Sequence, residues 1–250
     1  MKTSALLIFA ILILSSCSKV MYMPNTINAP LFNERNEFKA NVSMNNFQAA
    51  FAPASHFGIM ANGYTRSSNY SSGGSSSDIN YSSSRNLFEG GIGYFNTLSE
   101  GFVYEIYGGG GVGSLTYNGD QMYSGTGNVI YKYSADFSRF FIQPSIGFSH
   151  DIVDVSISAR IVRLSFNNIR TENYTQQMLI NEDIYNLDQS DYFFIEPALT
   201  FRVGYKWCKF QTQLLYSNKL NLETLNYKKF TVSAGLQIDI APRFKTNKQK

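Results

Sequence analysis

Alternation of apolar and polar residues with a period of two is the feature that most constrains the fold of this chain. Residues 153–161 read VDVSISARI, so the valines, isoleucines and alanine fall on one face, and the serines, aspartate and arginine fall on the other. Residues 209–217 and 228–240 alternate in the same way. Because successive side chains of a β-strand point to opposite faces, this period indicates strands with one apolar and one polar face. No helical period competes with it, so we predict an all-β fold.

The connections between these segments alternate in length, which predicts a series of antiparallel hairpins. The expected strands lie near residues 38–44, 46–53, 57–66, 85–96, 102–117, 136–149, 153–166, 191–204, 209–217 and 228–240. The short connections lie near residues 53–56, 97–101, 150–152 and 205–208, and the long polar ones near 67–84, 118–135, 167–190 and 218–227. Short turns at one end and long loops at the other are typical of transmembrane β-barrels.

Two details of this arrangement are open to test. The first hairpin is joined only by Asn45-Asn46, so the barrel has about ten strands, or eight if that hairpin does not form. The Ser- and Gly-rich stretch 67–84 has low complexity, so we expect it to be a mobile loop.

Two expected strands carry a proline at their centre, in FFIQPSIGF (140–148) and FFIEPALTF (193–201). Pro144 and Pro197 occupy a position that the equivalent strands fill with small residues: Ala49, Gly90 and Ala234. Proline has no N–H to donate to a β-ladder. We therefore expect both prolines on the outward apolar face, each with a bulge or a local bend.

The make-up of the polar face decides which face meets lipid. Charged residues are 16% of the chain, below the usual quarter, and the polar face is mostly Gly, Ser, Thr and Gln, whereas a water-facing surface carries many Lys and Glu. We therefore expect the polar face to line a narrow lumen. The residues expected there are Glu89, Glu105, Gln143, Arg160, Glu196, Arg202, Gln213 and Asp239. Arginine facing lipid near the midplane costs about 2–4 kcal/mol, so Arg160 and Glu196 should pair inside, directly or through Gln143.

Aromatic residues gather where the expected strands end, as expected for rings at the level of lipid headgroups. The belt near the short turns contains Tyr94, Phe148, Tyr205 and Trp207, and the belt near the long loops contains Phe140 and Phe193. The alternative architecture is a soluble lipocalin-like barrel with its apolar face turned inward, and its function would be that of a lipid-binding lipoprotein.

The N-terminus carries an export signal. Lys2 precedes the apolar run 5–14, which is shorter than the roughly 20 residues of a membrane-spanning helix. The following LSSC, residues 14–17, resembles the lipobox of bacterial lipoproteins. That resemblance implies that residues 1–16 are removed and that Cys17 is lipidated. Cys208 is the only other cysteine, so we expect no disulfide framework.

Residues 37–241 as a whole resemble the small up-and-down outer-membrane barrels of the OmpA and OmpX type. The resemblance implies a closed antiparallel transmembrane β-barrel in the outer membrane of a Gram-negative cell envelope, with the lipid bilayer and other outer-membrane proteins as candidate partners. Residues 17–36 would form a tether anchored on the periplasmic side, and the long loops would face outside. Such barrels often end on an aromatic residue, whereas this chain continues in a basic tail, 242–250.

The chain offers few candidates for chemistry. His56 and His150 both fall at short turns, and the adjacent residues of Ser149-His150-Asp151 point to opposite faces of a strand, so they form no local catalytic triad. The glycines of 107–113 lack the Lys-Ser/Thr and the following helix of a phosphate loop. Cys, His and carboxylate residues are too dispersed for a metal site. We therefore expect no cofactor, no metal and no enzymatic activity, and a net charge of +3 does not favour nucleic acid.

Three functions follow from this architecture. The first is a non-enzymatic barrel lipoprotein with a structural, interaction or accessory role through its long loops. The second is a narrow pore, plugged by residues 18–36. The third is a membrane hydrolase or acyltransferase that uses His56 or His150. A barrel of about eight strands is filled by its own side chains, which argues against a wide porin.

Overall fold

Ten long strands form the wall of the molecule in the computed structural model, which describes residues 20–74, 77–99, 101–123 and 127–240. The strands are β1 (Phe38–Ser43), β2 (Asn46–Ala54), β3 (Phe57–Gly74), β4 (Ser77–Ser99), β5 (Phe102–Tyr123), β6 (Gly127–Ser149), β7 (Val153–Glu172), β8 (Asp191–Tyr205), β9 (Cys208–Tyr216) and β11 (Phe230–Asp239). A two-residue strand, β10 (Asn218–Lys219), and one short helix, α2 (Gln176–Asn181), complete the described elements.

Each strand pairs antiparallel with its neighbour in sequence, and the sheet closes on itself. β8 pairs with β9, β9 with β11, and β11 with β1, which joins the two ends of the chain into one seam. β10 continues the line of β9 along the edge of β8. The predicted closed antiparallel barrel of about ten strands is confirmed. No helix in the described residues is long and apolar enough to cross a membrane.

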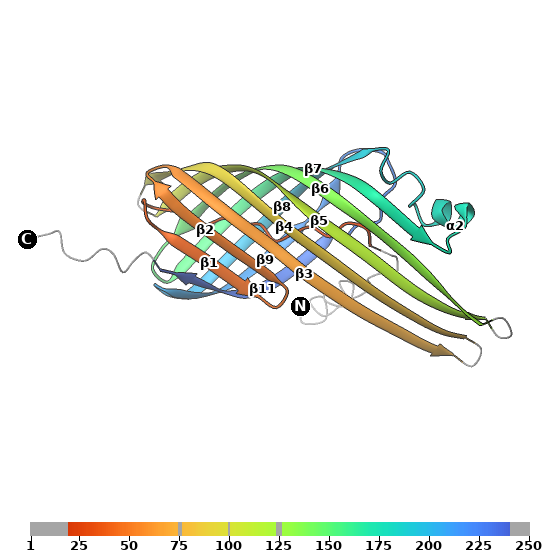
Figure 1. Ribbon diagram of the computed structural model, residues 1–250. Coiled ribbons are helices and arrows are strands. Elements are labelled where there is room, and N and C mark those ends of the chain that lie inside the picture. The colour runs from red at the N-terminus through yellow and green to blue at the C-terminus, as the bar shows by residue number, and fades with distance from the viewer. Residues whose placement is uncertain (1–19, 75–76, 100, 124–126, 241–250) are drawn as a thin grey trace, which may run out of the picture.

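The wall is much taller on one side than on the other, as Figure 1 shows for β3 to β6. The ladder between β3 and β4 continues without a break from Arg66↔Arg85 to Gly74↔Ser77. The expected mobile loop 67–84 is therefore wrong: most of it is strand. The expected loop 118–135 is likewise mostly strand, because β5 and β6 pair as far as Tyr123↔Gly127. Ladder hydrogen bonds use only the backbone, so a Ser- and Gly-rich sequence forms them without an apolar face.

The third expected loop, 167–190, is partly strand. β7 continues to Glu172, and α2 then begins after Thr175, whose hydroxyl accepts a hydrogen bond from the backbone N–H of Met178. The tall end of the barrel is therefore the end of the long connections, called the long-loop end below. The opposite end carries the short turns and is called the short-turn end.

Both prolines lie on the outward face, but neither produces a bulge. Beside Pro144, the pairs Ile142↔Ile161 and Ser145↔Ser158 keep the same register. Beside Pro197, β8 passes from β9 to β10 without a shift in register. The expected bulge is therefore wrong. Each proline interrupts the ladder on one side only, and the intact ladder on the other side, such as Ile106↔Pro144, holds the strand in place.

The outward face carries a continuous apolar band. Ile92, Ile157 and Val232 are each more than 60% exposed. The six residues expected in aromatic belts also point outward, and all except the half-buried Phe148 are more than 40% exposed: Tyr94, Phe140, Phe193, Tyr205 and Trp207. An exposed apolar surface that encircles a protein marks contact with something other than water.

Candidate functional site in the barrel lumen

The N-terminal segment occupies the inside of the barrel. Residues 20–32 run through the lumen without regular secondary structure, as the red trace in Figure 1 shows. Eleven of these thirteen residues are buried: Met21, Tyr22, Pro24, Asn25, Thr26, Ile27, Asn28, Ala29, Pro30, Leu31 and Phe32. We call residues 20–32 the plug segment.

The plug segment runs from the long-loop end to the short-turn end. At its start, the Val20 carbonyl accepts hydrogen bonds from Arg85, and Tyr22 pairs with Tyr227 in the long connection before β11. At its end, the ring of Phe32 packs against Phe95 near the short turns. The chain then turns back and enters β1. Val20 therefore lies at the long-loop end, and the expected anchoring of the tether on the periplasmic side stays a prediction, because Cys17 lies outside the described residues.

The lumen holds the plug segment mainly through its backbone. Gln213 brackets Ile27: its Nε2 donates to the Ile27 carbonyl (2.8 Å), and its Oε1 accepts from the Ile27 N–H (2.7 Å). Other plug carbonyls accept hydrogen bonds from the barrel: Val20 from Arg85, Met23 from Tyr64, Asn25 from Arg160, Asn28 from Gln143, Ala29 from Arg202 and Leu31 from Lys39. A segment held in this way is fixed in direction and in register.

Four buried charges form the centre of the site. Arg160 contacts Glu196 (Nη2 to Oε2, 2.8 Å) and Glu89 (Nη1 to Oε1, 3.2 Å). Arg139 lies 3.3 Å from Glu89 and 3.6 Å from Glu196. All four side chains have no exposed surface. Two positive and two negative charges cancel, which reduces the cost of burying each one.

The plug segment completes this charge network. The Tyr22 hydroxyl donates to Glu196 (2.6 Å), and Asn25 Nδ2 donates to Glu89 (3.0 Å). The carboxylates therefore accept hydrogen bonds from the plug in addition to their contacts with the arginines. Barrel and plug are one hydrogen-bonded unit at this level.

A second cluster lies nearer the short-turn end. Asp154 accepts from Lys209 (2.7 Å), and Arg202 donates to Gln211 (2.7 Å). Glu105 accepts from the Leu31 N–H (3.0 Å). The Leu31 side chain packs closely against the barrel wall at Gly147. A Cβ atom at that position would lie 2.8 Å from the Leu31 side chain.

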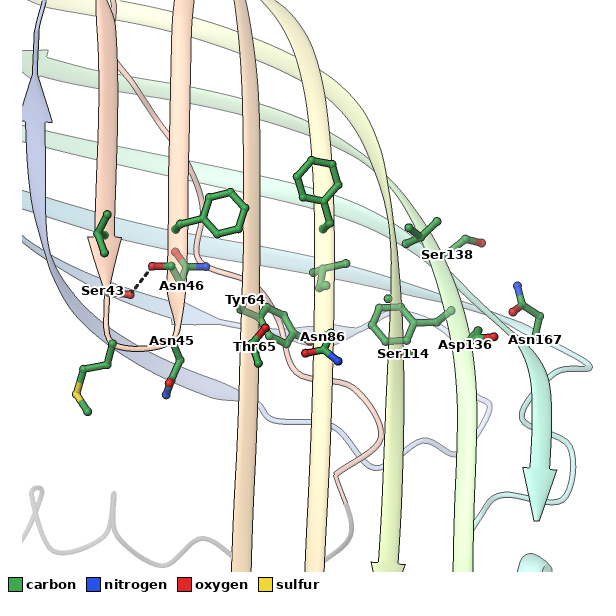
Figure 2. Close-up of a pocket in the computed structure, with 18 residues that line it drawn as sticks. Ser43, Asn45, Asn46, Tyr64, Thr65, Asn86, Ser114, Asp136, Ser138 and Asn167 are labelled. Carbon is green, nitrogen blue, oxygen red and sulfur yellow. Dashed lines mark hydrogen bonds between the residues drawn. The ribbon is translucent and has the colours of Figure 1, made fainter. Parts of the chain in front are cut away.

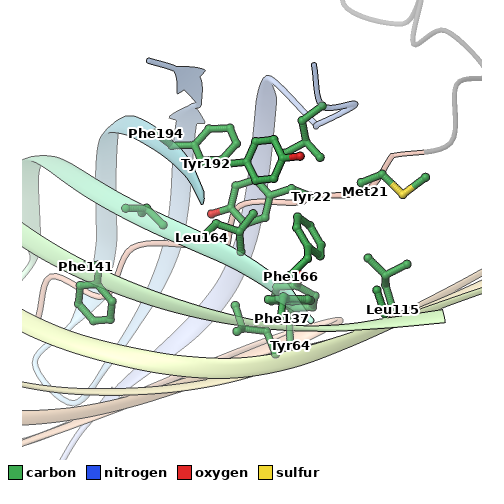
Figure 3. Close-up of a cluster of buried hydrophobic side chains, with 14 of the residues drawn as sticks. Met21, Tyr22, Tyr64, Leu115, Phe137, Phe141, Leu164, Phe166, Tyr192 and Phe194 are labelled. Atoms are coloured by element: carbon green, nitrogen blue, oxygen red, sulfur yellow. The ribbon is translucent and has the colours of Figure 1, made fainter. Parts of the chain in front are cut away.

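An apolar cluster closes the lumen toward the long-loop end. Met21 and Tyr22 lie among buried side chains from several strands, as Figure 3 shows. The Tyr22 ring lies 4.7 Å from the ring of Phe194, which in turn packs on Tyr227 at 5.2 Å. The rings of Tyr22 and Phe194 are 1% exposed or less, so the plug is buried among aromatic side chains at this level.

The residues expected in the lumen are all buried there. Glu89, Gln143, Arg160 and Glu196 meet at the central network or hold the plug beside it. Nearer the short turns, Glu105, Arg202 and Gln213 contact the plug, and Asp239 accepts a hydrogen bond from Gln237 on the same strand. Arg160 and Glu196, which we expected to pair, lie directly opposite each other and contact without Gln143 between them. Gln143 instead binds the plug.

Sequence reasoning missed Arg139 and Lys209, and it placed Asp154 on the polar face of its strand without naming it among the lumen residues. All three have the strand parity of the inward face, since Arg139 lies four residues before Gln143 on β6. That parity was the available signal. Tyr22 and Asn25 carried no such signal, because the plug segment has no strand period.

The histidines lie apart from the lumen network. His56 stacks on Tyr94 at the turn after β2, and His150 stacks on Phe148 at the turn after β6. In the part of the chain that the structure describes, no group of His, Cys, Asp and Glu is arranged to hold a metal ion. Cys17, the expected lipidation site, lies outside the described residues, as do the signal peptide and the basic tail.

No protein-family model and no curated protein matches this sequence. Among solved structures, the outer membrane protease OmpT from Escherichia coli is similar at a TM-score of 0.47, with 12% identity over 82% of this chain and 92% of that chain. Acinetobacter baumannii CarO2 is similar at a TM-score of 0.32, with 11% identity over 83% of this chain and 100% of that chain.

Proposed function

We propose that this protein is a non-enzymatic outer-membrane barrel, lipidated on Cys17, which is closed by its own plug and acts through its long-loop end as a structural or interaction partner. The apolar outward band supports the membrane location, and the paired charges inside support a lumen that is not a soluble lipocalin-like cavity. The packing of His56 and His150 on rings at the short turns speaks against a catalytic use of either residue.

The single observation that carries this proposal is the filled lumen. Ten strands enclose a space between the side-chain-filled lumen of eight strands and the open channel of sixteen or more. Here the plug segment occupies that space and bonds to the barrel along its whole length. A barrel held closed in this way separates the two sides of the membrane and leaves its rim for binding.

Planar-bilayer recording tests the proposal with the plug intact and released. A protease site inserted between Glu34 and Arg35, both exposed at the short-turn end, allows the plug to be cut from the folded barrel. We expect no steady conductance from the uncut protein or from the cut protein. Conductance should appear only after mild denaturant removes the freed peptide.

The control is the same protein without the inserted site, treated with protease and denaturant. Gel mobility of boiled and unboiled samples confirms in each case that the barrel is folded. Steady conductance of the uncut, folded protein would contradict a closed barrel and support the pore alternative.

A further inference from the structure

The barrel wall has a notch beside the start of the plug. β2 pairs with β3 only as far as Tyr64, and beyond Thr65 the described part of β3 has β4 as its only strand partner. Across the gap, β11 pairs with β1 from Gly235 onward, so the preceding five residues of β11 pair only with β9. The tip of the β1–β2 hairpin, Met44-Asn45, forms the floor of this notch.

Val20 lies at the height of the notch. Its carbonyl is bound by Arg85, and Arg85 is paired with Arg66, the first β3 residue above the floor. Cys17 is three residues earlier, so it lies within about 10 Å of Val20 along an extended chain. Adjacent strands are about 4.8 Å apart, so the chain before Val20 is long enough to leave the lumen over the hairpin tip.

A groove of about 1050 Å³ lies on the outside of the wall at this tip. Its lower part is an apolar row in which Val42, Phe47 and Phe88 are outward and exposed. The Phe47 ring lies across Gly63, where a Cβ atom would come within 2.5 Å of the ring. The surface of the wall is therefore recessed where it carries a small residue such as Gly63, and the bulky rings of Phe47 and Phe88 border this recess.

A polar row lies directly above the apolar one. Five outward residues follow one another across neighbouring strands through direct pairing: Thr65, Asn86, Ser114, Asp136 and Asn167. Figure 2 shows these five side chains side by side along the groove. An apolar row under a polar row is the arrangement that a lipid requires, with acyl chain below and linkage above.

We propose that this groove seats the acyl chains on Cys17 of the same molecule, so that the lipid anchor lies at the long-loop end and not at the short-turn end. This inference rests on the lipidation included in the proposed function. The described course of residues 20–32 brings Val20 to this side of the barrel, and the notch provides an exit next to the groove.

The chemistry of the polar row favours an acylated cysteine over other lipids. Among the residues that the structure describes, Asp136 is the only charged one that lines the groove. Phospholipids and lipopolysaccharide carry anionic phosphates, which a carboxylate repels and which arginine or lysine would have to bind. The amide, thioether and ester groups of an acylated cysteine are uncharged, and the hydroxyls and amides of Thr65, Asn86 and Ser114 can hydrogen-bond to them.

Photo-cross-linking in intact outer membranes tests the proposal. A benzophenone amino acid replaces Val112 in the groove or, as the matched control, Thr212, which faces outward on β9 on another part of the wall. Cells are fed an alkyne-bearing fatty acid, and cross-linked peptides are identified by mass spectrometry. We expect the acylated N-terminal peptide to be joined to position 112 several-fold more than to position 212.

Two further variants sharpen the test. Ser138→Trp fills the groove and should reduce the cross-link several-fold, whereas the control Thr212→Trp should leave it unchanged. Cys17→Ala should abolish it. Heat-dependent gel mobility confirms that each variant is folded.

Equal cross-linking at positions 112 and 212 would overturn the inference, as would cross-links from position 112 to phospholipid or lipopolysaccharide alone. In those cases Cys17 still carries the alkyne label, and the proposed function stands. Absence of the label from Cys17 would overturn both the inference and the lipidation in the proposed function, while the conductance experiment would still report on the closed barrel.

Discussion

The inner and outer faces of β7 show how differently one strand is constrained on its two sides. Ile157 and Ile161 point outward and are 62% and 50% exposed, whereas Arg160 between them has no exposed surface. The outward residues need only be apolar to suit the lipid contact that we propose for this face. The inward residue must place its guanidinium against two carboxylates and a plug carbonyl. On the outer face, any apolar residue should therefore be tolerated, whereas on the inner face only a particular residue makes the required contacts.

The largest expected effect comes from breaking the inner face at Arg160. Arg160→Met leaves Glu89 and Glu196 with Arg139 as their remaining guanidinium, and removing one partner of a buried ion pair costs about 3–5 kcal/mol. The free energy of unfolding in urea, measured after refolding into lipid vesicles, reports this loss. The control Ile161→Met, on the outward face of the same strand, should cost less than about 1.5 kcal/mol. Similar losses for the two variants would contradict the comparison.

On the outer face, a substitution that adds a charge should destabilise the barrel, whereas one that changes only the shape of the side chain should not. Ile157 lies midway along the apolar band of β7, so Ile157→Arg should lower the free energy of unfolding by about 2–4 kcal/mol. Ile157→Leu keeps the residue class and should have little effect. The same urea titration in vesicles measures both, and an equal tolerance of arginine and leucine would show that this surface does not face lipid.

The contact between barrel and plug should have an intermediate effect. Gln213→Leu removes both hydrogen bonds to Ile27 and leaves two buried backbone groups without their side-chain partner, at a cost of about 1–3 kcal/mol. Amide hydrogen exchange of Ile27 should become faster while exchange in β4 and β5 stays slow. The outward control Thr212→Val should change neither the stability nor the exchange rate of Ile27. Unchanged exchange at Ile27 in Gln213→Leu would show that the two hydrogen bonds from Gln213 do not hold this part of the plug.

The smallest effect is expected at an ion pair outside the lumen. The hydrogen bond from Lys206 Nζ (2.8 Å) holds the pKa of Asp151 below its usual range at the short-turn end. This contribution is present above the ordinary Asp pKa and is lost as the pH falls through the lowered one. Lys206→Met should return the Asp151 pKa to its ordinary range in an NMR titration, without a measurable change in unfolding. A large loss of stability would mean that exposed pairs matter as much as buried ones.

Period-two alternation was sufficient to predict the strands and their faces, because the wall of this barrel is apolar on its outer face and largely polar on its inner face. It failed above the apolar band, where both faces of β3 and β4 are polar or small and the sequence is typical of a loop. The bulges expected at Pro144 and Pro197 are absent because pairing on one side of each strand is enough to keep register, which a single sequence does not show. The direction of the plug was also beyond sequence reasoning, since it depends on contacts such as Gln213 with Ile27, which lie 186 residues apart.

The course of the plug also determines the order in which the molecule is assembled. β1 follows the plug directly in sequence, and its pairing with β11 closes the ring. The lumen is packed closely around the plug at Tyr22 and Arg160, which leaves little room to thread the segment after the ring has closed. We therefore expect the N-terminal segment to lie against the inner wall before β1 pairs with β11 and closes the ring. Closure of the barrel and enclosure of the plug are then a single event, in which a partly open sheet already holds its N-terminal segment.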